Sequence, residues 1–427
     1  MIVKKTVACF TFFILLFNFE EGIPCSSYKI TLDGKTMMGS NYDSWLEAPM
    51  IWFETNNYGA VFTGARPDGK SRTAPQSGMN EFGLGFITLA TATPENGAPS
   101  PAKKPIANRT DFLKNIVHTC KTVDEVRASI DQYDHSTLSE EVLLFVDKSG
   151  KYLVVEPYTM STGNDSTYVL SNFCPSTITD FSTIKQRRYI NGTAFLKNKI
   201  DTSVSFCTSL SDTMHVCREK LGDGTLLTSI WDLNDGVTYL YFYHDYDHQV
   251  KFNLKDELAK GDHSIAIEPL FPPNAEYKKL VDFKTPNNSP VIDLFLRSCV
   301  FLFFISAIFF LISYFTKRKT TRYAYIKLLL VPLSLLMMFY MVVLANKENI
   351  FYFPAPYTDG SFSVVSVAGY IPFLILLLIV PLLFINRKIF RDSGWRVIPK
   401  WIFTLNNVAY LALIGLFSYW GLYNVFT

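Results

Sequence analysis

The sequence lacks the features that mark several classes of protein. Its formal net charge is only +2, so the composition gives no reason to expect a nucleic-acid partner. Its seven cysteines include no CxxC pair, and therefore no zinc or redox motif is indicated. A disulfide between Cys207 and Cys217 outside the cell is left open. We expect neither a cofactor nor a metal site.

The first 24 residues lack an apolar run long enough to cross a bilayer. Lys4 and Lys5 precede a run of about ten apolar residues, which is the pattern of a secretory signal. Pro24 is a poor residue before a signal-peptidase cut, so a cut near Gly22 with trimming by the protein itself is one way to expose Cys25. We therefore expect residues 1–24 to be a signal peptide or propeptide. Lipidation of Cys25 is less favoured, because the residues before it do not resemble a lipobox.

Residues 25–282 have an ordinary globular composition and are expected to form one exported domain. Residues alternate between apolar and polar before Asp33-Gly34, which predicts a hairpin with a tight turn. Helices are expected at residues 111–120, 123–130, 188–199 and 208–220, and two last strands at 227–231 and 237–243. Clusters of strands separated by paired helices predict a layered α+β fold rather than alternating βαβ units.

Residues 283–427 are expected to form an all-α membrane domain of four transmembrane helices, at about 294–315, 328–345, 364–385 and 401–423. Basic residues gather after the first span and between the third and fourth, so these loops are predicted to be cytoplasmic. That orientation places residues 25–282 on the extracytoplasmic side, periplasmic or extracellular, in agreement with the signal peptide. A transporter is disfavoured, because the spans contain few polar residues and no evident internal repeat.

Short motifs then follow in a fixed order. Residues 25–27 read Cys-Ser-Ser, residues 39–43 Gly-Ser-Asn-Tyr-Asp, residues 78–84 Gly-Met-Asn-Glu-Phe-Gly-Leu, and residues 169–172 Val-Leu-Ser-Asn. Together these motifs resemble the linear amide C–N hydrolases of the N-terminal-nucleophile superfamily. That group includes choloylglycine (bile salt) hydrolases, penicillin V acylases, acid ceramidase and acyl-CoA:6-aminopenicillanate acyltransferase. The resemblance covers about residues 25–254 and implies a four-layer αββα sandwich.

The resemblance also implies a chemistry for four residues. Cys25, once it begins the mature chain, would attack an amide carbonyl and form a thioester, with its own α-amine as the base. An α-amine has a pKa near 8, which suits proton transfer at neutral pH. Asp43 would hold the α-amine, whereas Asn80 and Asn172 would help to form the oxyanion hole. Such an enzyme needs no catalytic histidine.

Two departures from the family pattern concern arginines. Ser40 stands where the family has an arginine before Asn-x-Asp, and residues 225–233 contain no match for a second arginine near the end of the domain. Arg187 and Arg188 are interpreted as the solvated start of a helix. These departures weaken the transfer of a bile-salt substrate more than they weaken the assignment of Cys25.

The leading hypothesis is a membrane-tethered hydrolase of linear N-acyl amides, acting on a small-molecule or lipid substrate. An acyltransferase that uses the same thioester is one alternative. A degenerate sensor that binds an acyl ligand and signals through the membrane helices is another, and Ser40 is the reason to keep it. A metal site at residues 244–248 is disfavoured, because histidines and carboxylates are common in turns. The acyl group, the amine and the oligomeric state are left open.

Overall fold

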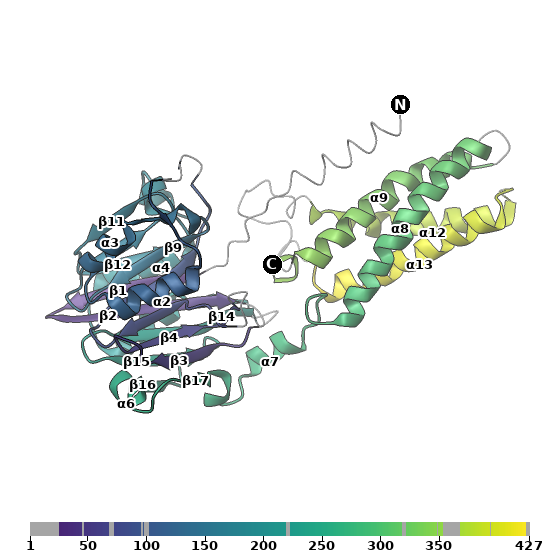
Figure 1. Ribbon diagram of the computed structural model, residues 1–427. Coiled ribbons are helices and arrows are strands. Elements are labelled where there is room, and N and C mark those ends of the chain that lie inside the picture. The colour runs from purple at the N-terminus through teal and green to yellow at the C-terminus, as the bar shows by residue number, and fades with distance from the viewer. Residues whose placement is uncertain are drawn as a thin grey trace. The chain divides into compact units, whose positions relative to one another are not determined.

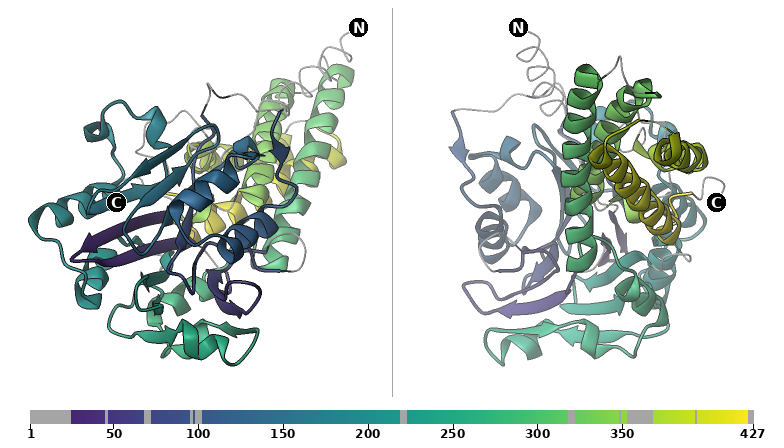
Figure 2. Two further views of the ribbon diagram at one scale, coloured as in Figure 1. Left: turned by 60° about the vertical axis from the view of Figure 1, so that its left-hand side comes forward. Right: turned by 90° about the vertical axis from the view of Figure 1, so that its right-hand side faces the viewer.

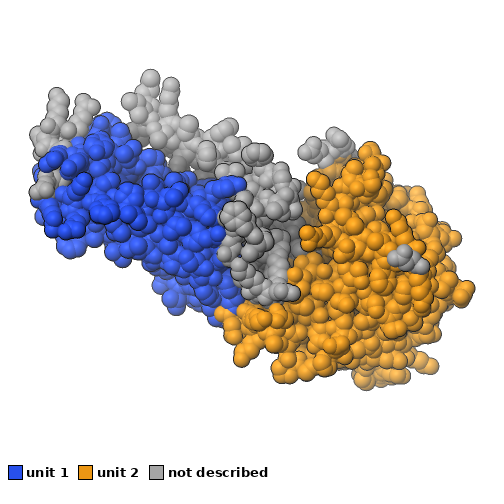
Figure 3. Space-filling model, turned by 180° about the vertical axis from the view of Figure 1, so that it is seen from behind, with its two compact units in different colours: residues 1–19, 283–427 blue, residues 20–282 orange. Residues whose placement is uncertain are grey.

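The structure is a computed structural model that describes residues 25–44, 47–67, 72–94, 97, 102–218, 223–317, 322–347, 349–352, 368–392 and 394–423. The expected signal peptide at residues 1–24 lies outside these ranges. The described chain divides into two compact units, with the boundary between Asp282 and Phe283, and Figure 3 colours them separately. Each unit is described by itself below.

The first sheet begins with the predicted hairpin. Strands β1 (Cys25–Leu32) and β2 (Lys35–Ser44) are joined by Asp33 and Gly34, which both have positive φ angles, as a two-residue hairpin turn of type I′ requires. Gly39 faces the ring of Tyr28, and a Cβ at Gly39 would lie 2.1 Å from that ring. The sheet has the order β12 (Thr167–Ser171), β1, β2, β14 (Asp223–Asp232), β15 (Val237–Phe242), β16 (Val250–Asn253), and β13 (Cys217–Arg218) pairs with β14.

The second sheet is also antiparallel throughout. Its strands are rich in Val, Leu, Ile and Phe and are buried along most of their length, which is typical of strands covered on both faces. In order they are β11 (Met160–Gly163), β10 (Tyr152–Val155), β9 (Glu141–Val146), β6 (Gly85–Ala90), β5 (Ser77–Asn80), β4 (Ala60–Gly64), β3 (Met50–Glu54) and β17 (His263–Ala266).

Two pairs of helices cover the two sheets (Figure 1). α2 (Arg109–Thr119) and α3 (Val123–Ile130) share a buried apolar core with the second sheet, whereas α4 (Arg187–Asn198) and α5 (Val204–Met214) share one with the first. The layers therefore run helix, sheet, sheet, helix, which is the layered α+β order that the sequence predicts. The smaller elements are β7 (Lys104–Pro105), β8 (Tyr133–Asp134), α6 (Leu254–Leu258), α7 (Ala275–Asp282) and the 3₁₀ turns His135–Thr137, Pro175–Thr177, Phe181–Thr183 and Glu268–Leu270.

Polar contacts join the two sheets at their inner faces. Tyr28 and Ile30 of β1 belong to the core shared with α4 and α5. Because side chains alternate along a strand, Cys25 and Lys29 belong to the opposite face, toward the second sheet. Lys29 is fully buried there, and its Nζ donates to the carbonyl of Gly150 at 2.8 Å.

The sequence placed most elements of this unit but not its end. The helix predicted at residues 123–130 is confirmed as α3, and its N-cap is Thr122, whose Oγ1 accepts from Glu125 N. The expectation that 237–243 is the last strand is wrong, because β16 and β17 follow and extend one edge of each sheet. α5 ends at Met214, earlier than the predicted residue 220, because residues 217–218 turn into strand β13.

The second unit is built from four long helices that are apolar and long enough to cross a membrane, a composition that fits membrane association. α8 packs against α9 and α13, and α13 packs against α12, as the views in Figure 2 allow the reader to follow. The third predicted span, 364–385, begins in residues that the structure does not describe, and its helix continues beyond residue 385 to Asp392. The bounds are α8 (Pro290–Lys317), α9 (Ala324–Asn346), α12 (Ile371–Asp392), α13 (Val397–Tyr419) and the short α10 (Asn349–Tyr352).

Candidate active site

Cys25 is the first residue of β1 and is 4% exposed. Its backbone nitrogen donates to Asn172 Oδ1 at 2.7 Å. β1 is an inner strand that pairs with β2 on one side and β12 on the other, so both neighbours fix the position of Cys25. The pairing of β1 with β12 also explains why Asn172, which directly follows β12, lies beside Cys25 although 147 residues separate them.

Arg188 lies at this site, which corrects its interpretation as a solvated helix start. It is the second residue of α4, and its Nε donates to the carbonyl of Cys25 at 3.0 Å and to Ser171 Oγ at 2.7 Å. Its Nη2 donates to Asn172 Oδ1 at 2.6 Å. The guanidinium group thus holds both the backbone of Cys25 and the amide that contacts the nitrogen of Cys25. The sequence shows an arginine soon after Asn172, but it does not show which face of α4 that arginine occupies.

Asn172 bridges the two sheets. Its Nδ2 donates to the carbonyl of Ala90, at the end of β6, at 2.7 Å. Its Oδ1 accepts from Cys25 and Arg188, so in this structure the oxygen of the amide faces the backbone nitrogen of Cys25. The structure therefore brings Asn172 to Cys25, with a contact that orients the nitrogen of Cys25.

Asp43 lies near the end of β2, one residue beyond Tyr42, which pairs with Cys25. Its Oδ1 accepts from Thr225 Oγ1 at 2.5 Å, and Thr225 Oγ1 accepts from the backbone N–H of Val216 at 3.0 Å. This chain of donors fixes the carboxylate next to the first residue of β1. Asp43 is buried, at 2% exposed, so its charge acts strongly on its neighbours.

Burial and, after it, the negative charge of Asp43 raise the pKa of the Cys25 thiol, which reaches about 12 once the opposing effects are included. A hydrogen bond from the backbone of Asp43 and the positive charges of Arg188 and Arg66 act in the opposite direction. The thiol is therefore neutral at physiological pH. A nucleophile of this kind needs a nearby base to take its proton.

Asn80 does not lie with the other three predicted residues. Its Nδ2 donates to the carbonyls of Val117 and Cys120, at 2.7 and 2.8 Å, and its Oδ1 accepts from Phe82 N and Leu84 N, both at 3.1 Å. These contacts bind the C-terminal end of α2 to the turn after β5. The motif at residues 78–84 thus acquires a structural explanation, and both ends of the Asn80 amide are already engaged, so these contacts do not supply the expected oxyanion-hole donor.

A small cavity of about 70 Å³ lies beside Cys25. Its wall includes Arg66, which follows β4 and pairs with Glu47 at 3.1 Å. Glu47 also accepts from Tyr42 Oη at 2.6 Å. Ser40, in β2, stands where the family pattern has an arginine. Arg66, which follows β4, brings a positive charge to the site from another part of the chain. The residues that line the cavity are Cys25, Tyr42, Arg66, Ala74, Gln76, Thr88, Ala90, Arg109 and Glu141.

Sequence reasoning missed Arg66 and Gln76. Arg66 follows β4 and Gln76 precedes β5, in segments without a recognisable motif. They come close to Cys25 only because the second sheet packs against the first. Arg109 and Glu141, which form an ion pair at the cavity wall, were missed for the same reason.

Two other possibilities that the sequence raises can be located in the structure. No disulfide joins Cys207 to Cys217 here. His248 Nδ1 lies 2.9 Å from Asp245 Oδ2 in an exposed turn. Within the described residues, no group of three or more His, Cys, Asp or Glu side chains is arranged to hold a metal ion.

No protein-family model matches the sequence, and no curated protein matches it. Among solved structures, a variant of conjugated bile acid hydrolase from Clostridium perfringens is similar with a TM-score of 0.45 and 16% identity, over 59% of this chain and 99% of that one. A second mutant of that enzyme gives 0.43 and 16%, over 59% and 97%. Penicillin V acylase from Agrobacterium tumefaciens gives 0.41 and 12%, over 51% and 82%. Because these scores and identities are low, the function proposed next rests on the residues of this chain.

Proposed function

We propose that residues 25–282 form a hydrolase of linear N-acyl amides, in which Cys25 becomes the N-terminal residue and acts as the nucleophile. The observation that carries this proposal is the placement of the Cys25 nitrogen. That nitrogen lies 2.7 Å from Asn172 Oδ1, while the thiol is buried at the wall of a cavity. When the chain begins at Cys25, the same nitrogen is an α-amine held beside its own thiol.

The proposed reaction has two steps. The α-amine takes the thiol proton as the sulfur attacks the amide carbonyl carbon, and the carbonyl electron pair moves onto oxygen. The oxyanion then collapses, the C–N bond breaks, and the leaving nitrogen takes the proton from the α-ammonium group. Water, deprotonated by the α-amine, then attacks the thioester and releases a carboxylic acid. Arg188 and Asp43 are positioning residues in this scheme, because they hold the backbone and charge around Cys25.

The four apolar helices support a membrane-tethered, multi-pass enzyme. We infer from the basic loops and the signal-like N-terminus that residues 25–282 lie on the extracytoplasmic side. A small-molecule or lipid N-acyl amide is the proposed substrate, and a lipid substrate would reach the enzyme from the bilayer. For Cys25 to carry a free α-amine, residues 1–24 must be removed; a cut near Gly22 followed by trimming by the protein itself is one route.

The test of this proposal uses the full chain purified from membranes. N-terminal sequencing is expected to begin at Cys25, and the protein is expected to hydrolyse decanoyl-7-amino-4-methylcoumarin. Intact mass of an acid-quenched reaction is expected to show one added acyl group, which Cys25→Ala removes together with turnover. A mature chain that begins before residue 25, or turnover that survives Cys25→Ala, would overturn the proposal.

The proposed orientation has its own test in a host that glycosylates exported proteins. Asn164, within the sequon at residues 164–166, is exposed between β11 and β12. Asn191, within the sequon at 191–193, lies inside α4 and donates its Nδ2 to the carbonyl of Thr213 at 3.2 Å. We expect a glycan that Asn164→Gln removes and Asn191→Gln leaves in place. An unmodified wild-type chain, beside a secreted control protein that is glycosylated, would contradict the extracytoplasmic placement.

A further inference from the structure

The structure leaves the developing oxyanion without its expected donor. Asn80 uses its Nδ2 group on the end of α2, and Asn172 directs its Oδ1 to the nitrogen of Cys25. A tetrahedral intermediate formed at Cys25 places negative charge in the cavity beside the thiol, where an N–H donor stabilises it. The donor must therefore come from the cavity wall.

Gln76 lies in that wall, just before β5. Its Oε1 accepts a hydrogen bond from the backbone N–H of Ala65 at 3.1 Å. A backbone N–H can only donate, so this contact fixes which end of the Gln76 amide is oxygen. The Nε2 group is therefore the other end of a side chain that belongs to the cavity lining, and it makes no hydrogen bond to any residue that the structure describes. Gln76 is held in place further by its backbone, which bonds to Thr63 and Thr88.

Other donors of the cavity wall are engaged only in part. Arg66 and Arg109 each use Nε on a carboxylate, that of Glu47 and that of Glu141, and each guanidinium has further N–H groups. Tyr42 Oη donates to Glu47, and Thr88 also lines the cavity. A threonine hydroxyl can rotate, whereas the Gln76 amide is fixed by Ala65 and presents its N–H groups without rearrangement. Preorganised donors are the ones that lower the barrier most.

We propose that Gln76 is a catalytic residue whose Nε2 donates to the oxyanion formed when Cys25 attacks an amide carbonyl. This inference rests on the proposed function, since it needs the Cys25 intermediate. It adds a residue from the second sheet to a site whose nucleophile belongs to the first.

The decisive variant is Gln76→Glu, assayed in the full chain at about pH 8, where the new carboxylate is ionised. Glutamate keeps an acceptor for Ala65 N–H but removes the donor, so we expect kcat for decanoyl-7-amino-4-methylcoumarin to fall by about 10² to 10³. Gln76→Met, which has no donor, gives a second test if the glutamate variant folds poorly. Gln132→Glu is the matched control, because Gln132 is exposed and far from the cavity lining.

A second measurement separates catalysis from folding. Decanal forms a hemithioacetal with a cysteine thiol and so mimics the tetrahedral intermediate. Its affinity is expected to fall in Gln76→Glu by about the same factor as kcat/KM, as for a group that acts on the transition state. The rate at which iodoacetamide alkylates Cys25 is expected to stay close to the wild-type rate in Gln76→Met, which adds no charge. In Gln76→Glu the rate is expected to fall, because a negative charge beside Cys25 raises the pKa of its thiol, as that of Asp43 does.

The outcomes distinguish this inference from the proposed function. If wild-type chain does not hydrolyse the coumarin amide, the proposed function fails and takes the inference with it. If wild-type chain is active and Cys25→Ala is inactive, but Gln76→Glu and Gln76→Met match the Gln132→Glu control, only the role of Gln76 is overturned. A large loss in Thr88→Val with none in Gln76→Glu would also overturn it and would assign the donor to Thr88.

Discussion

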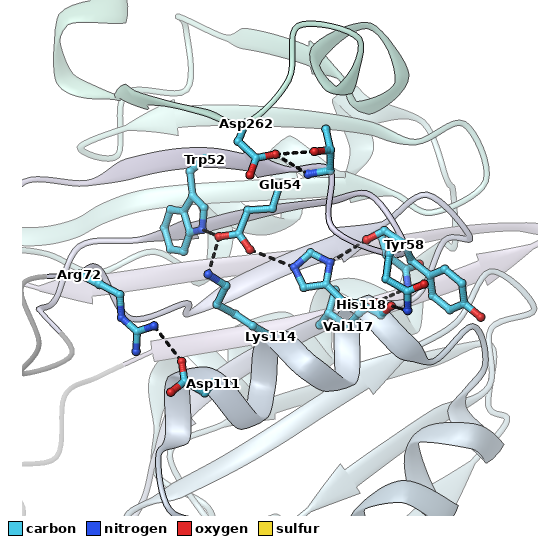
Figure 4. A network of polar contacts seen from close by, with 12 residues as sticks. Trp52, Glu54, Tyr58, Arg72, Asp111, Lys114, Val117, His118 and Asp262 are labelled. Carbon is cyan, nitrogen blue, oxygen red and sulfur yellow. Dashed lines mark hydrogen bonds and ion pairs between the residues drawn. The ribbon is translucent and has the colours of Figure 1, made fainter.

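Two polar clusters within residues 25–282 use similar side chains in opposite ways. Figure 4 shows the first, where α2 meets the second sheet. Glu54 accepts from Trp52 Nε1 at 3.0 Å, Lys114 Nζ at 2.5 Å and His118 Nε2 at 2.9 Å. His118 Nδ1 lies 2.7 Å from the carbonyl of Tyr58. Each of these groups is therefore satisfied by another group of the protein.

In the cluster at Cys25, not every polar group is bonded to another group of the protein. Asn172 and Arg188 hold the backbone of Cys25, whereas Gln76 lines the cavity and its Nε2 makes no hydrogen bond to any residue that the structure describes. Buried polar groups stabilise a fold when they are satisfied internally, and a site that keeps donors for a substrate gives up part of that stability. The comparison predicts that substitutions in the first cluster change stability, whereas those in the second change activity.

The largest expected effect is that of Arg188→Gln. The substitution removes charge-assisted hydrogen bonds to Asn172 Oδ1 and to the carbonyl of Cys25, so we expect kcat/KM to fall by about 10² to 10³. It also removes a positive charge that lowers the pKa of the Cys25 thiol, so the pH profile of iodoacetamide alkylation is expected to move to higher pH. Arg187→Gln, at the exposed neighbouring position, is the control and should leave both unchanged. If kcat/KM falls equally in Arg188→Gln and Arg187→Gln, the loss comes from a disturbed α4 and not from the contacts of Arg188.

Asn172→Ala is expected to follow, with a loss of about 10² in kcat/KM. The variant frees the nitrogen of Cys25 from its acceptor and removes the bond to Ala90, but it opens no large cavity. With the bond from Arg188 included, three hydrogen bonds are lost, so the midpoint of thermal unfolding should fall by about 6 °C, or about 2 kcal/mol in a domain of this size. If stability falls but the activity of the folded fraction does not, Asn172 has only a structural role.

Asn80→Ala is expected to show the opposite behaviour. It leaves the carbonyls of Val117 and Cys120 buried without their donor, and two backbone N–H groups lose an acceptor. We expect a destabilisation of about 3 kcal/mol, or a fall of about 10 °C in the midpoint of thermal unfolding. Activity per folded molecule, measured well below the midpoint, should stay near the wild-type value. A loss of about 10² in kcat without destabilisation would restore the oxyanion-hole role that the sequence motif implied.

The two asparagines also show how far the sequence could be read. Both belong to motifs that resemble the same family, and both were assigned to the oxyanion hole from that resemblance. The first lies at a turn and binds a helix end, which depends on where α2 packs and is not encoded in residues 78–84. The second follows a strand that pairs with β1, so its closeness to Cys25 follows from a single strand pairing. Motif order can imply the latter contact, but not the former.

Local patterns predicted what depends on neighbours in the chain. The Asp33-Gly34 turn, the Thr122 cap and the four long apolar helices each arise from a few adjacent residues. The positive charges at Cys25 were missed, because Arg66 and Arg188 reach it from different layers of the fold. The sequence records an arginine at each position and gives no information on which layer will face which.

The smallest expected effect concerns the pH dependence of stability. Burial lowers the pKa of His118, but hydrogen bonds to Glu54 and the Tyr58 carbonyl outweigh it, and the pKa lies above its ordinary value of 6.5. Its contribution to stability is therefore full below that ordinary value and is lost as the pH rises through the folded-state pKa. Burial lowers the pKa of His135, only partly opposed by a bond to the Glu156 carbonyl, so its contribution has the opposite sign and stability falls as the pH falls through the ordinary value.

His118→Gln should accordingly remove a decline in the thermal midpoint on the alkaline side, and His135→Gln a decline on the acidic side. Each change is expected to be a few degrees, about the size of one altered hydrogen bond. The measurement is the thermal midpoint of the full chain across about pH 5 to 9, with wild type, the two variants and the double variant. If the two variants shift the profile in the same direction, the doubly hydrogen-bonded His118 of the first cluster is not charged. A charged His118 paired with Glu54 would then no longer distinguish the first cluster from the cluster at Cys25.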